Sequence, residues 1–410
     1  MRMTEALRTR VTFPILVLSV SSLVAILLVQ LWIRSLGPAQ QAIAFRYQSF
    51  VFIEFPYMFL MCWYIWKRMS VLPRWSRAPL LLVMILGMAR FGMNPFTQTD
   101  PNIIVYLTSM SMATVILLSS ILGISDVIMY VVISRDKEYY SKMRAWLCLV
   151  IVIMVLIIER HIAEDIKITR LGIPVNSHIS QDGLTIAQLS DIHLGPNVGR
   201  TKLTSIVEMT NQLQPDVVVI TGDLIDAPFD YLQFAVQPLA GLKSKLGVYF
   251  ITGNHEYYTG DIDHWLLKLP DYGVKPLINS RVKLLPDLYL AGLEDYQTKK
   301  MNYGNHMMDV HAALAGRDRG IPTIVLAHQP KAVLEAIYWE DVFLVLSGHT
   351  HAGQFYPIAL PVYLMQPFFA GLYEPRPGVY VYVSSGTVYN WMPLRDFYWP
   401  EIVLYTLTNT

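Results

Sequence analysis

The chain has 410 residues, of which 53% are hydrophobic and only 15% are charged, and its mean hydropathy is +0.38. These values exclude an ordinary soluble protein of this length and indicate that part of the chain lies in lipid. Residues 1–158 carry a formal net charge of +8 and the remainder carries −7. The overall charge of +1 is therefore the sum of a basic part and an acidic part. Both cysteines of the sequence, Cys62 and Cys148, stand in apolar stretches, and no disulfide framework is expected.

Membrane helices are predicted for the first half. A helix crosses the hydrocarbon layer with about 20 residues, and five apolar runs approach that length. They lie at residues 11–33, 47–66, 78–93, 103–124 and 145–160. We therefore predict an all-α transmembrane domain of five helices over residues 1–162. Because the first run lacks a small-residue cleavage site, we expect a retained helix rather than a signal peptide.

The basic residues that flank the apolar runs predict the orientation of the chain. Eleven of them precede the first run or follow the second and fourth runs, whereas the alternate connections hold only three. The positive-inside rule then places the N-terminus in the cytoplasm, and five crossings place the chain beyond about residue 160 on the luminal or extracellular face. Glu54, Arg90 and Asp126 could mark an ion path in this half or make polar contacts between helices. We expect the half to act as a membrane anchor.

A different pattern, in which short β-rich runs alternate with amphipathic stretches, begins at Ile166. The predicted strands are 184–189, 216–221, 247–252, 288–293, 323–327, 342–346 and 379–384, and the predicted helices are 202–213, 229–242, 261–269, 307–315 and 331–338. Since strand and helix alternate, we expect an α/β domain over residues 163–410, with helices on the outer faces of its sheet. Roughly 240 residues can bury one sizeable core.

Polar residues directly follow five of the predicted strands. They are Asp191-Ile192-His193 after the first, Gly222-Asp223 after the second, Gly253-Asn254-His255-Glu256 after the third, His328 after the fifth and Gly348-His349-Thr350-His351 after the sixth. Ligands bind beyond the ends of the strands in α/β sheets. We therefore expect these residues to converge on one site.

The residue types in these blocks suit a pair of divalent cations. Imidazole nitrogen and carboxylate or amide oxygen are ligands for zinc, manganese or iron, and thiolate is absent from the blocks. A carboxylate can bridge two ions, and two cations roughly 3.5 to 4 Å apart can hold both the attacking and the leaving oxygen of a phosphoryl displacement. The glycines of three blocks would let the backbone approach the ions closely.

At these residues the sequence resembles the calcineurin-like metallophosphoesterases. The blocks of that family, DxH, GD, GNH[ED], an isolated His and GHxH, appear here in order as DIH, GD, GNHE, AHQ and SGHTHAGQ. The resemblance lies wholly after the apolar half, and it implies that residues 163–410 form a metallophosphoesterase domain. It further implies a two-sheet β-sandwich flanked by helices and a metal-dependent phosphoric ester hydrolase that uses two divalent ions, Mn, Fe or Zn.

The resemblance also implies a role for each matching residue. The metal ligands would be Asp191, His193 and His351 for the first ion, Asn254, His328 and His349 for the second, and Asp223 for both. His255 would contact the phosphate and either protonate the leaving oxygen or stabilise the charge of the transition state. The implied reaction is direct attack of activated water on phosphorus, without a covalent enzyme intermediate.

The expected partners are a phosphoester substrate and the membrane, with no nucleic acid. The substrate class includes phosphomonoesters and phosphodiesters, whether soluble or carried by a phospholipid or other lipid. The uncharged segment Phe355 to Tyr373 follows the last block and should border the site. It is either a proline-broken loop packed on the core or a membrane-facing lip that admits a lipid-linked ester. Arg200 could bind a phosphate oxygen or be a solvated loop residue.

Two other classes of protein stay open at this point. The fold could serve as a catalytically silent interaction module, although every ligand position is present. It could also be a sensor domain attached to a transporter-like bundle, which would require polar residues that line several of the apolar helices.

Overall fold

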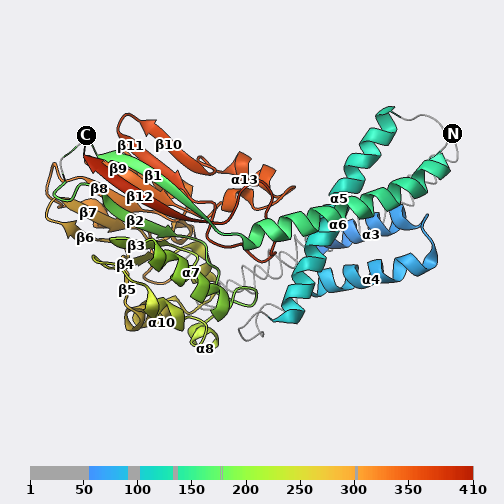
Figure 1. Ribbon diagram of the computed structural model, residues 1–410, viewed down its shortest axis with the longest axis horizontal. Helices are drawn as coiled ribbons and strands as arrows, with labels where there is room; N and C mark the ends of the chain where they lie inside the picture. The colour runs from blue at the N-terminus through green and yellow to red at the C-terminus, as the bar shows by residue number, and fades with distance from the viewer. Residues whose placement is uncertain are drawn as a thin grey trace.

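The computed structural model describes residues 55–90, 102–132, 137–175, 177, 179–300 and 303–409. A group of helices lies at one end of the described chain, and two β-sheets with their own helices lie at the other (Figure 1). The first predicted apolar run and Glu54 fall outside the described residues.

Four helices make up the described part of the first half. They are α3 (Phe55–Met69), α4 (Arg74–Ala89), α5 (Ile103–Val132) and α6 (Lys137–Glu164). Two stretches are long and apolar enough to cross a membrane, the 29 residues Ile103–Val131 and the 24 residues Ser141–Glu164. Within the described residues, α3 has 15 residues and α4 has 16, fewer than the about 20 that a crossing needs. The described residues thus contain two candidate crossings, and the predicted bundle of five is not confirmed.

Asp126 of α5 joins three helices. Its carboxylate pairs with Arg68 of α3 at 2.5 Å and with Arg144 of α6, and it accepts a hydrogen bond from the Tyr64 hydroxyl at 2.6 Å. Opposite charges in contact offset the cost of placing each of them among apolar helices. Asp126 therefore makes an inter-helix contact, which is the second of the two roles open to it from the sequence.

The helices are attached to the sheets covalently and through polar contacts. Strand β1 (Lys167–Val175) begins three residues after α6 ends at Glu164, so the first sheet continues directly from this helix. Near the start of α5, Ser109 Oγ accepts hydrogen bonds from Arg90 Nε at 2.9 Å and from Asn197 Nδ2 at 3.1 Å. Arg90 is therefore part of the contact between the helices and the sheet domain.

One hydrophobic cluster includes residues from both halves. Phe355, Met392 and Leu394 from the C-terminal half are buried together with Met84 of α4 and Met112 of α5. Burial of this size stabilises the contact by roughly 1.5 to 3 kcal/mol for each large side chain. The C-terminal half is therefore packed against the helices as well as tethered to them.

Two six-stranded sheets form the second half. Their strand orders are β1-β12-β2-β3-β4-β5 and β10-β11-β9-β8-β7-β6. The bounds are β2 (Leu184–Leu189), β3 (Val217–Thr221), β4 (Val248–Ile251), β5 (Val274–Pro276), β6 (Ser280–Leu285), β7 (Leu288–Gly292), β8 (Thr323–Leu326), β9 (Val342–Ser347), β10 (Gly371–Arg376), β11 (Val379–Val383) and β12 (Glu401–Asn409). Both sheets are mixed, because β12 runs antiparallel to β2 in the first and β6 and β10 run antiparallel to their neighbours in the second.

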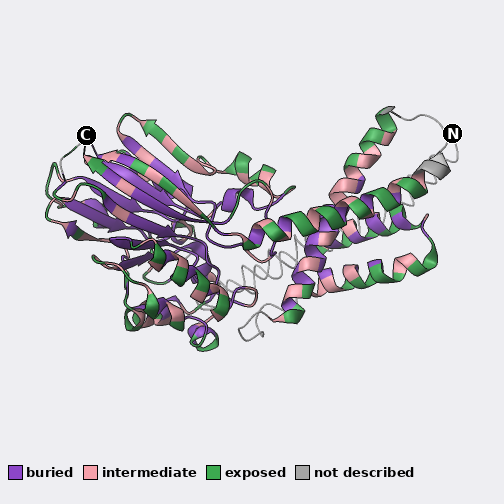
Figure 2. Ribbon diagram, in the orientation of Figure 1, coloured by how far each residue is buried: buried purple, intermediate pink, exposed green. Residues whose placement is uncertain are grey.

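The hydrophobic core of this half lies in three layers. Ile186, Val219 and Leu346 are among the side chains buried between the two sheets. The outer faces are covered by α7 (Arg200–Gln212) and α10 (Ile262–Lys268) on the first sheet and by α11 (Val310–Leu314) and α12 (Pro330–Ala336) on the second. Central strands are consequently buried on both faces (Figure 2), which explains their continuous apolar runs.

The seven predicted strands correspond to β2, β3, β4, β7, β8, β9 and β11, to within one residue at each end. The predicted helix 229–242 is instead broken into α8 (Phe229–Leu232) and a 3-10 helix, Gln237–Gly241. Pro238 explains the break, since it lacks the backbone donor that a continuous helix would need. The sequence pattern does not predict β1, β5, β6, β10 or β12. Of these, β1 and β12 pair in parallel along their whole length, from opposite ends of the domain.

Candidate metal centre

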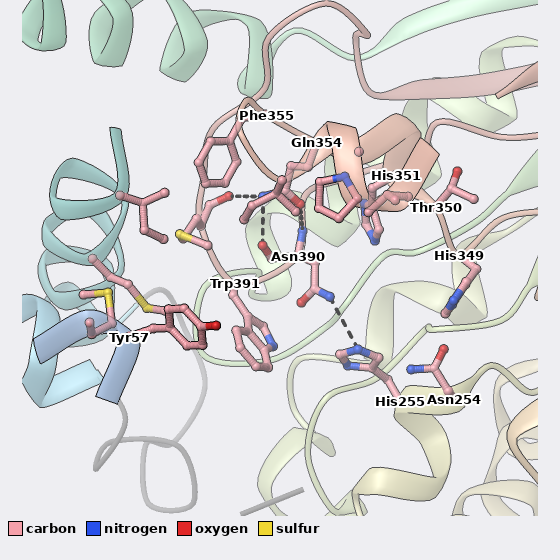
Figure 3. A pocket seen from close by; sticks show the side chains of 18 of the residues that line it. Tyr57, Asn254, His255, His349, Thr350, His351, Gln354, Phe355, Asn390 and Trp391 are labelled. Atoms are coloured by element: carbon pink, nitrogen blue, oxygen red, sulfur yellow. Dashed lines mark hydrogen bonds between the residues drawn. The ribbon is translucent and has the colours of Figure 1, made fainter. Parts of the chain in front are cut away.

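The five strand-end blocks come together in the structure. Three of them follow β2, β3 and β4 of the first sheet, and the other two follow β8 and β9 of the second. Figure 3 shows side chains from both sets, among them Asn254, His255, His349 and His351, around one space. Parallel strands bring their carboxyl ends to a common edge, so blocks that are far apart in the sequence lie close together in space.

Five residues of these blocks have a left-handed backbone, which is uncommon for residues other than glycine. Asp191, His193, Asp223, His349 and His351 have φ values of 55°, 51°, 50°, 72° and 49°. Such conformations cost of order 1–3 kcal/mol each, and they persist where the surrounding structure holds them. The direction in which these side chains point therefore comes at a cost to local stability.

The first group of potential ligands consists of Asp191, His193 and His351, all of which are buried. His193 Nε2 lies 2.9 Å from His351 Nε2, and His351 Nε2 lies 3.3 Å from Asp191 Oδ1. Asp191 is held in place by the backbone N–H of His349, which donates to its carboxylate at 3.0 Å. Three donor atoms from two strand ends thus face a common point.

The second group consists of Asp223, His328 and His349. His328 Nε2 lies 3.2 Å from Asp223 Oδ2, and the same oxygen lies 3.8 Å from His193 Nε2 of the first group. Asp223 therefore stands between the two groups, where one carboxylate can face both. Asn254, which is also buried, follows β4 beside this group.

Two buried atoms show that these residues fit a cation. Asn254 Oδ1 and His328 Nε2 have no hydrogen-bond partner among the described residues. His328 Nδ1 lies 2.8 Å from the carbonyl oxygen of Thr221 and donates to it, so in the neutral ring the lone pair is on Nε2, 3.2 Å from Asp223 Oδ2. Burial opposes protonation of His328, but Asp223 raises its pKa well above the usual value, so a positive charge, either a proton or a metal ion, is favoured at Nε2. Lone pairs that face each other in a buried site are unfavourable unless a positive charge lies between them. The oxygen and imidazole donors suit a divalent metal ion such as zinc, manganese or iron.

Glycine is required where the backbone passes closest to the donors. A Cβ at Gly253 would lie 2.2 Å from Asp223 Oδ1, and one at Gly348 would lie 2.3 Å from Asp191 Oδ2. Both distances are far inside van der Waals contact, so a larger residue would displace a carboxylate of the site. Gly222 additionally has a φ of 88°, which favours glycine.

Asp226 contacts two histidines of the candidate site, and the sequence pattern did not single it out. Its Oδ1 lies 2.6 Å from His255 Nδ1 and 3.0 Å from His193 Nδ1, so it accepts a hydrogen bond from each ring and turns both Nε2 atoms toward the site. Burial opposes ionisation of this carboxyl, but the two imidazoles hold its pKa well below the usual range. The only signal in the sequence is its place three residues after Asp223.

Glu256 holds the backbone of the site. Its carboxylate accepts hydrogen bonds from four buried backbone N–H groups, those of Asp223, Leu224, Ile225 and Gly253. Burial raises the pKa of this carboxyl to about 8, and the backbone donors act in the opposite direction. The side chain thus joins the turn after β3 to the turn after β4, although sequence reasoning assigned it no role.

The C-terminal tail contributes two further residues that the sequence did not single out. The fully buried Arg395 donates to the carbonyl oxygen of His351 at 2.9 Å, and its Nη2 lies 3.1 Å from His351 Nδ1. Asn390 Nδ2 lies 3.4 Å from His255 Nε2 (Figure 3). Both contacts join residues that are far apart in the sequence, so no local pattern could reveal them.

Burial sets the protonation state of several site histidines. It lowers the pKa of His349 to about 3 and that of His351 well below its usual range. These two rings are therefore neutral near pH 7, which is the state in which imidazole binds a cation. Burial opposes protonation of His193 as well, but Asp226 raises its pKa to about 9. A cation that binds at His193 must consequently displace a proton.

A cavity of about 830 Å³ adjoins the site. Asn254, His255, His349 and His351 line one part of it, and residues of α3 and α5 line another. Figure 3 shows Trp391 between the histidines and Tyr57 of α3. The cavity is large enough for a ligand of ordinary metabolite size, and the site is thus open to a substrate.

The segment Phe355 to Tyr373 borders the site as expected, and its parts differ in exposure. Phe355 is buried and lines the cavity. Helix α13 (Ala359–Met365) has no buried residue and exposes Leu364 and Met365. Phe368 is half-buried against the second sheet. The segment therefore combines a packed part with an exposed apolar helix.

Arg200 lies at the surface, away from the donor groups. Its Nη1 donates to the carbonyl oxygen of Phe234 at 2.9 Å and to Gln237 Oε1 at 2.7 Å, and its guanidinium lies over the Phe234 ring. These contacts favour the surface role over the phosphate-binding role.

Comparison with known proteins finds a family model and several similar sequences. The family model described as Calcineurin-like phosphoesterase matches residues 184–353. The chain is 46% identical over 244 residues to a Bos taurus protein named transmembrane protein with metallophosphoesterase domain, and the alignment covers 57% of this chain and 55% of the relative. It is 35% identical over 277 residues to an uncharacterized metallophosphoesterase of Campylobacter jejuni, covering 67% of this chain and 72% of the relative. The chain therefore spans about half the length of the bovine relative and a larger part of the bacterial one.

A solved dimetal phosphatase from Danio rerio also aligns, with 51% of this chain and 89% of its own chain, at a TM-score of 0.32 and 12% identity. This likeness is too slight to bear on the fold.

The region matched by the family model contains every strand-end block. It begins at Leu184, the first residue of β2, and ends at Gly353, two residues after His351. The bacterial relative matches over more than two thirds of its own length. The chain therefore belongs to the calcineurin-like metallophosphoesterase family.

Proposed function

We propose that this protein is a membrane-anchored phosphoesterase that depends on two divalent metal ions and hydrolyses a phosphomonoester or a phosphodiester. The observation that carries the proposal is the position of Asp223 between two groups of buried donors, 3.2 Å from His328 Nε2 and 3.8 Å from His193 Nε2. A shared carboxylate is what a pair of cations needs in order to stand close together.

Each side chain of the centre has a proposed role. The ligands of the first ion are Asp191, His193 and His351, those of the second are Asn254, His328 and His349, and Asp223 is common to both. When bound, two cations supply charge that stabilises the phosphoryl group and activates water at neutral pH. Among the protein groups, Asp226 orients the rings of His193 and His255, and Glu256 keeps the two turns of the site in register.

His255 is proposed as the catalytic acid. Asp226 Oδ1 accepts a hydrogen bond from His255 Nδ1 at 2.6 Å, so the Nε2 atom faces the site, 3.9 Å from Asp223 Oδ2. From this position Nε2 can donate a proton to the oxygen that leaves phosphorus. The same ring lines the cavity through which a substrate would enter.

The metal requirement gives the first test. We expect the full chain in lipid nanodiscs to lose turnover of 4-nitrophenyl phosphate or of bis(4-nitrophenyl) phosphate after chelation and to regain it with Mn²⁺, Zn²⁺ or Fe²⁺. Mass spectrometry of the elements should find two ions per chain in the active sample. Turnover that survives complete removal of metal, or a chain that holds two ions and hydrolyses neither ester, would contradict the proposal.

Residues 1–162 are proposed to form the membrane domain and residues 163–410 the catalytic domain. Basic residues of the helices lie at the end away from the sheets (Figure 1). They are Lys67 and Arg68 at the end of α3, Arg74 at the start of α4 and Arg144 in the first turns of α6. By the positive-inside rule this end lies in the cytoplasm. The catalytic domain then lies on the luminal or extracellular face, where it can act on a soluble ester or on one carried by a lipid.

Protease protection tests this orientation. In sealed vesicles of native orientation, we expect a tag at the C-terminus to resist external protease until detergent is added. Cleavage of the tag in intact vesicles would place the catalytic domain in the cytoplasm instead.

A further inference from the structure

The cavity beside the metal centre has two chemically different parts. One part is lined by the histidines and by Asn254, and the other is lined by Met58 and Met61 of α3 and by Met112 and Ile116 of α5. The spacing of three residues in the first pair and four in the second places each pair on one face of its helix. These four side chains present only hydrocarbon and thioether groups, and the hydroxyl of Tyr57 is a polar group that α3 adds to this part of the lining.

The loop Asn390–Met392 marks the boundary between the two parts. Gln354 fixes this loop, since its Nε2 donates to the carbonyl oxygens of Asn390 and Met392 at 3.0 and 2.8 Å and its Oε1 accepts from Asn390 N at 2.8 Å. Asn390 Oδ1 is buried and has no hydrogen-bond partner among the described residues. Within this loop, Trp391 lies between the histidines and Tyr57 of α3 (Figure 3), and Met392 is buried in the cluster that includes Met112 of α5.

The length of α5 places the apolar part of the cavity near the surface of the bilayer. Its predominantly apolar span of 29 residues extends roughly 43 Å at 1.5 Å per residue, which exceeds the about 30 Å of the hydrocarbon layer. The first part of the helix is bound to the sheet domain, because Asn102 N donates to Pro196 O at 3.1 Å and Ser109 Oγ accepts from Asn197. Residues 112–131 are then left for the lipid, so Met112 and Ile116 lie at its edge.

We propose that the apolar part of this cavity is a binding subsite for the aliphatic chain of an amphiphilic phosphoester, whose phosphate lies at the metal centre. The inference rests on the proposed phosphoesterase function and names its substrate class. The substrate's chain passes Trp391 and reaches the groove between α3 and α5, while its phosphate stays among the histidines. A chain in this groove replaces contacts with the lipid by contacts with the methionines, and a substrate that lacks one leaves the groove unfilled.

Two homologous series of esters test the subsite, so that the kind of ester need not be known. Alkyl monophosphates are followed by phosphate release, and alkyl 4-nitrophenyl phosphates by nitrophenolate release, with two to eight carbons and below the micelle concentration. For the full chain in nanodiscs with metal, we expect kcat/KM of the accepted series to rise with chain length, by up to about fourfold per methylene, which corresponds to about 0.8 kcal/mol.

Variants separate the subsite from the metal centre. Met61→Gln and Ile116→Thr should reduce the rise of kcat/KM with chain length and leave kcat/KM of the ethyl ester unchanged. Met154→Gln is the matched control, because Met154 is on α6, is 50% exposed and does not line the cavity. It should keep the slope of the wild type.

The outcomes distinguish the subsite from the function itself. If no ester of either series is hydrolysed in the presence of metal, the phosphoesterase proposal fails. If the ethyl ester is hydrolysed and longer chains bring no gain, only the subsite is overturned. An equal loss of slope in Met154→Gln would also overturn it, because the effect would then come from the helices in general.

Discussion

Replacement of Asp223 by Asn is expected to lower kcat for a 4-nitrophenyl ester by more than about 10³-fold, because even residues that only support a metal ligand are worth about 10–100-fold. Asn keeps the size of the side chain but removes the negative charge shared by the two donor groups. Its amide N–H₂ would also oppose a cation. The carboxylate is buried, with His328 Nε2 3.2 Å away, so solvent cannot replace it. Steady-state kinetics and the metal content of the same sample give the measurement.

Asp271→Asn is the matched control for this variant. Asp271 has a side chain that is 66% exposed, and its contact with Lys268 is a surface pair at 3.7 Å, which contributes little to stability. Activity and metal content should match the wild type. If Asp223→Asn retained two ions and a tenth of the wild-type rate, a shared ligand at this position would be ruled out.

Replacement of His255 by Ala is expected to lower kcat by about 10²–10⁴-fold for a phenyl ester and by much less for the 4-nitrophenyl ester. A poor leaving oxygen needs a proton in the transition state, whereas nitrophenolate can leave without one. Metal content should be unchanged, because His255 is not one of the proposed ligands. The measurement is the dependence of kcat on the leaving group, in the wild type and in the variant.

His264→Ala controls for the loss of an imidazole elsewhere in the domain. His264 is half-exposed on α10 and contacts Phe229 rather than the site, so its removal should leave both rates unchanged. Equal losses for the two leaving groups in His255→Ala would contradict proton donation. They would instead assign His255 to stabilisation of charge on the phosphoryl oxygens.

The residues of the candidate site could be selected from the sequence because they follow strands that are easy to recognise. Buried parallel strands such as β3 and β9 appear as continuous apolar runs, and the polar residue after such a run must lie at the edge of the sheet. His193 and Asp223 are therefore visible as candidates without coordinates. Their assignment to particular ions rests on resemblance to the family and stays a prediction.

Residues that support the site were missed because their partners are remote. Arg395 reaches His351 across 44 positions of the sequence, and Asn390 reaches His255 across 135. The turn that carries Arg395 has no metal-binding pattern of its own. Strand β12 was missed for a similar reason, since its pairing with β1 joins the two ends of the domain.

By itself, the sequence determined that the chain has an apolar half and an α/β half, and it located the strands and the polar residues at their ends. These features depend on hydrophobic periodicity and on residue type, which are local properties. Only the tertiary structure decided that Asp226 orients two histidines, that two described helices are long enough to cross a membrane, and that α3 and α5 form part of the wall of the cavity beside the candidate metal centre. Each of these depends on where distant segments pack against one another, because a contact between remote residues leaves no periodic trace in either segment.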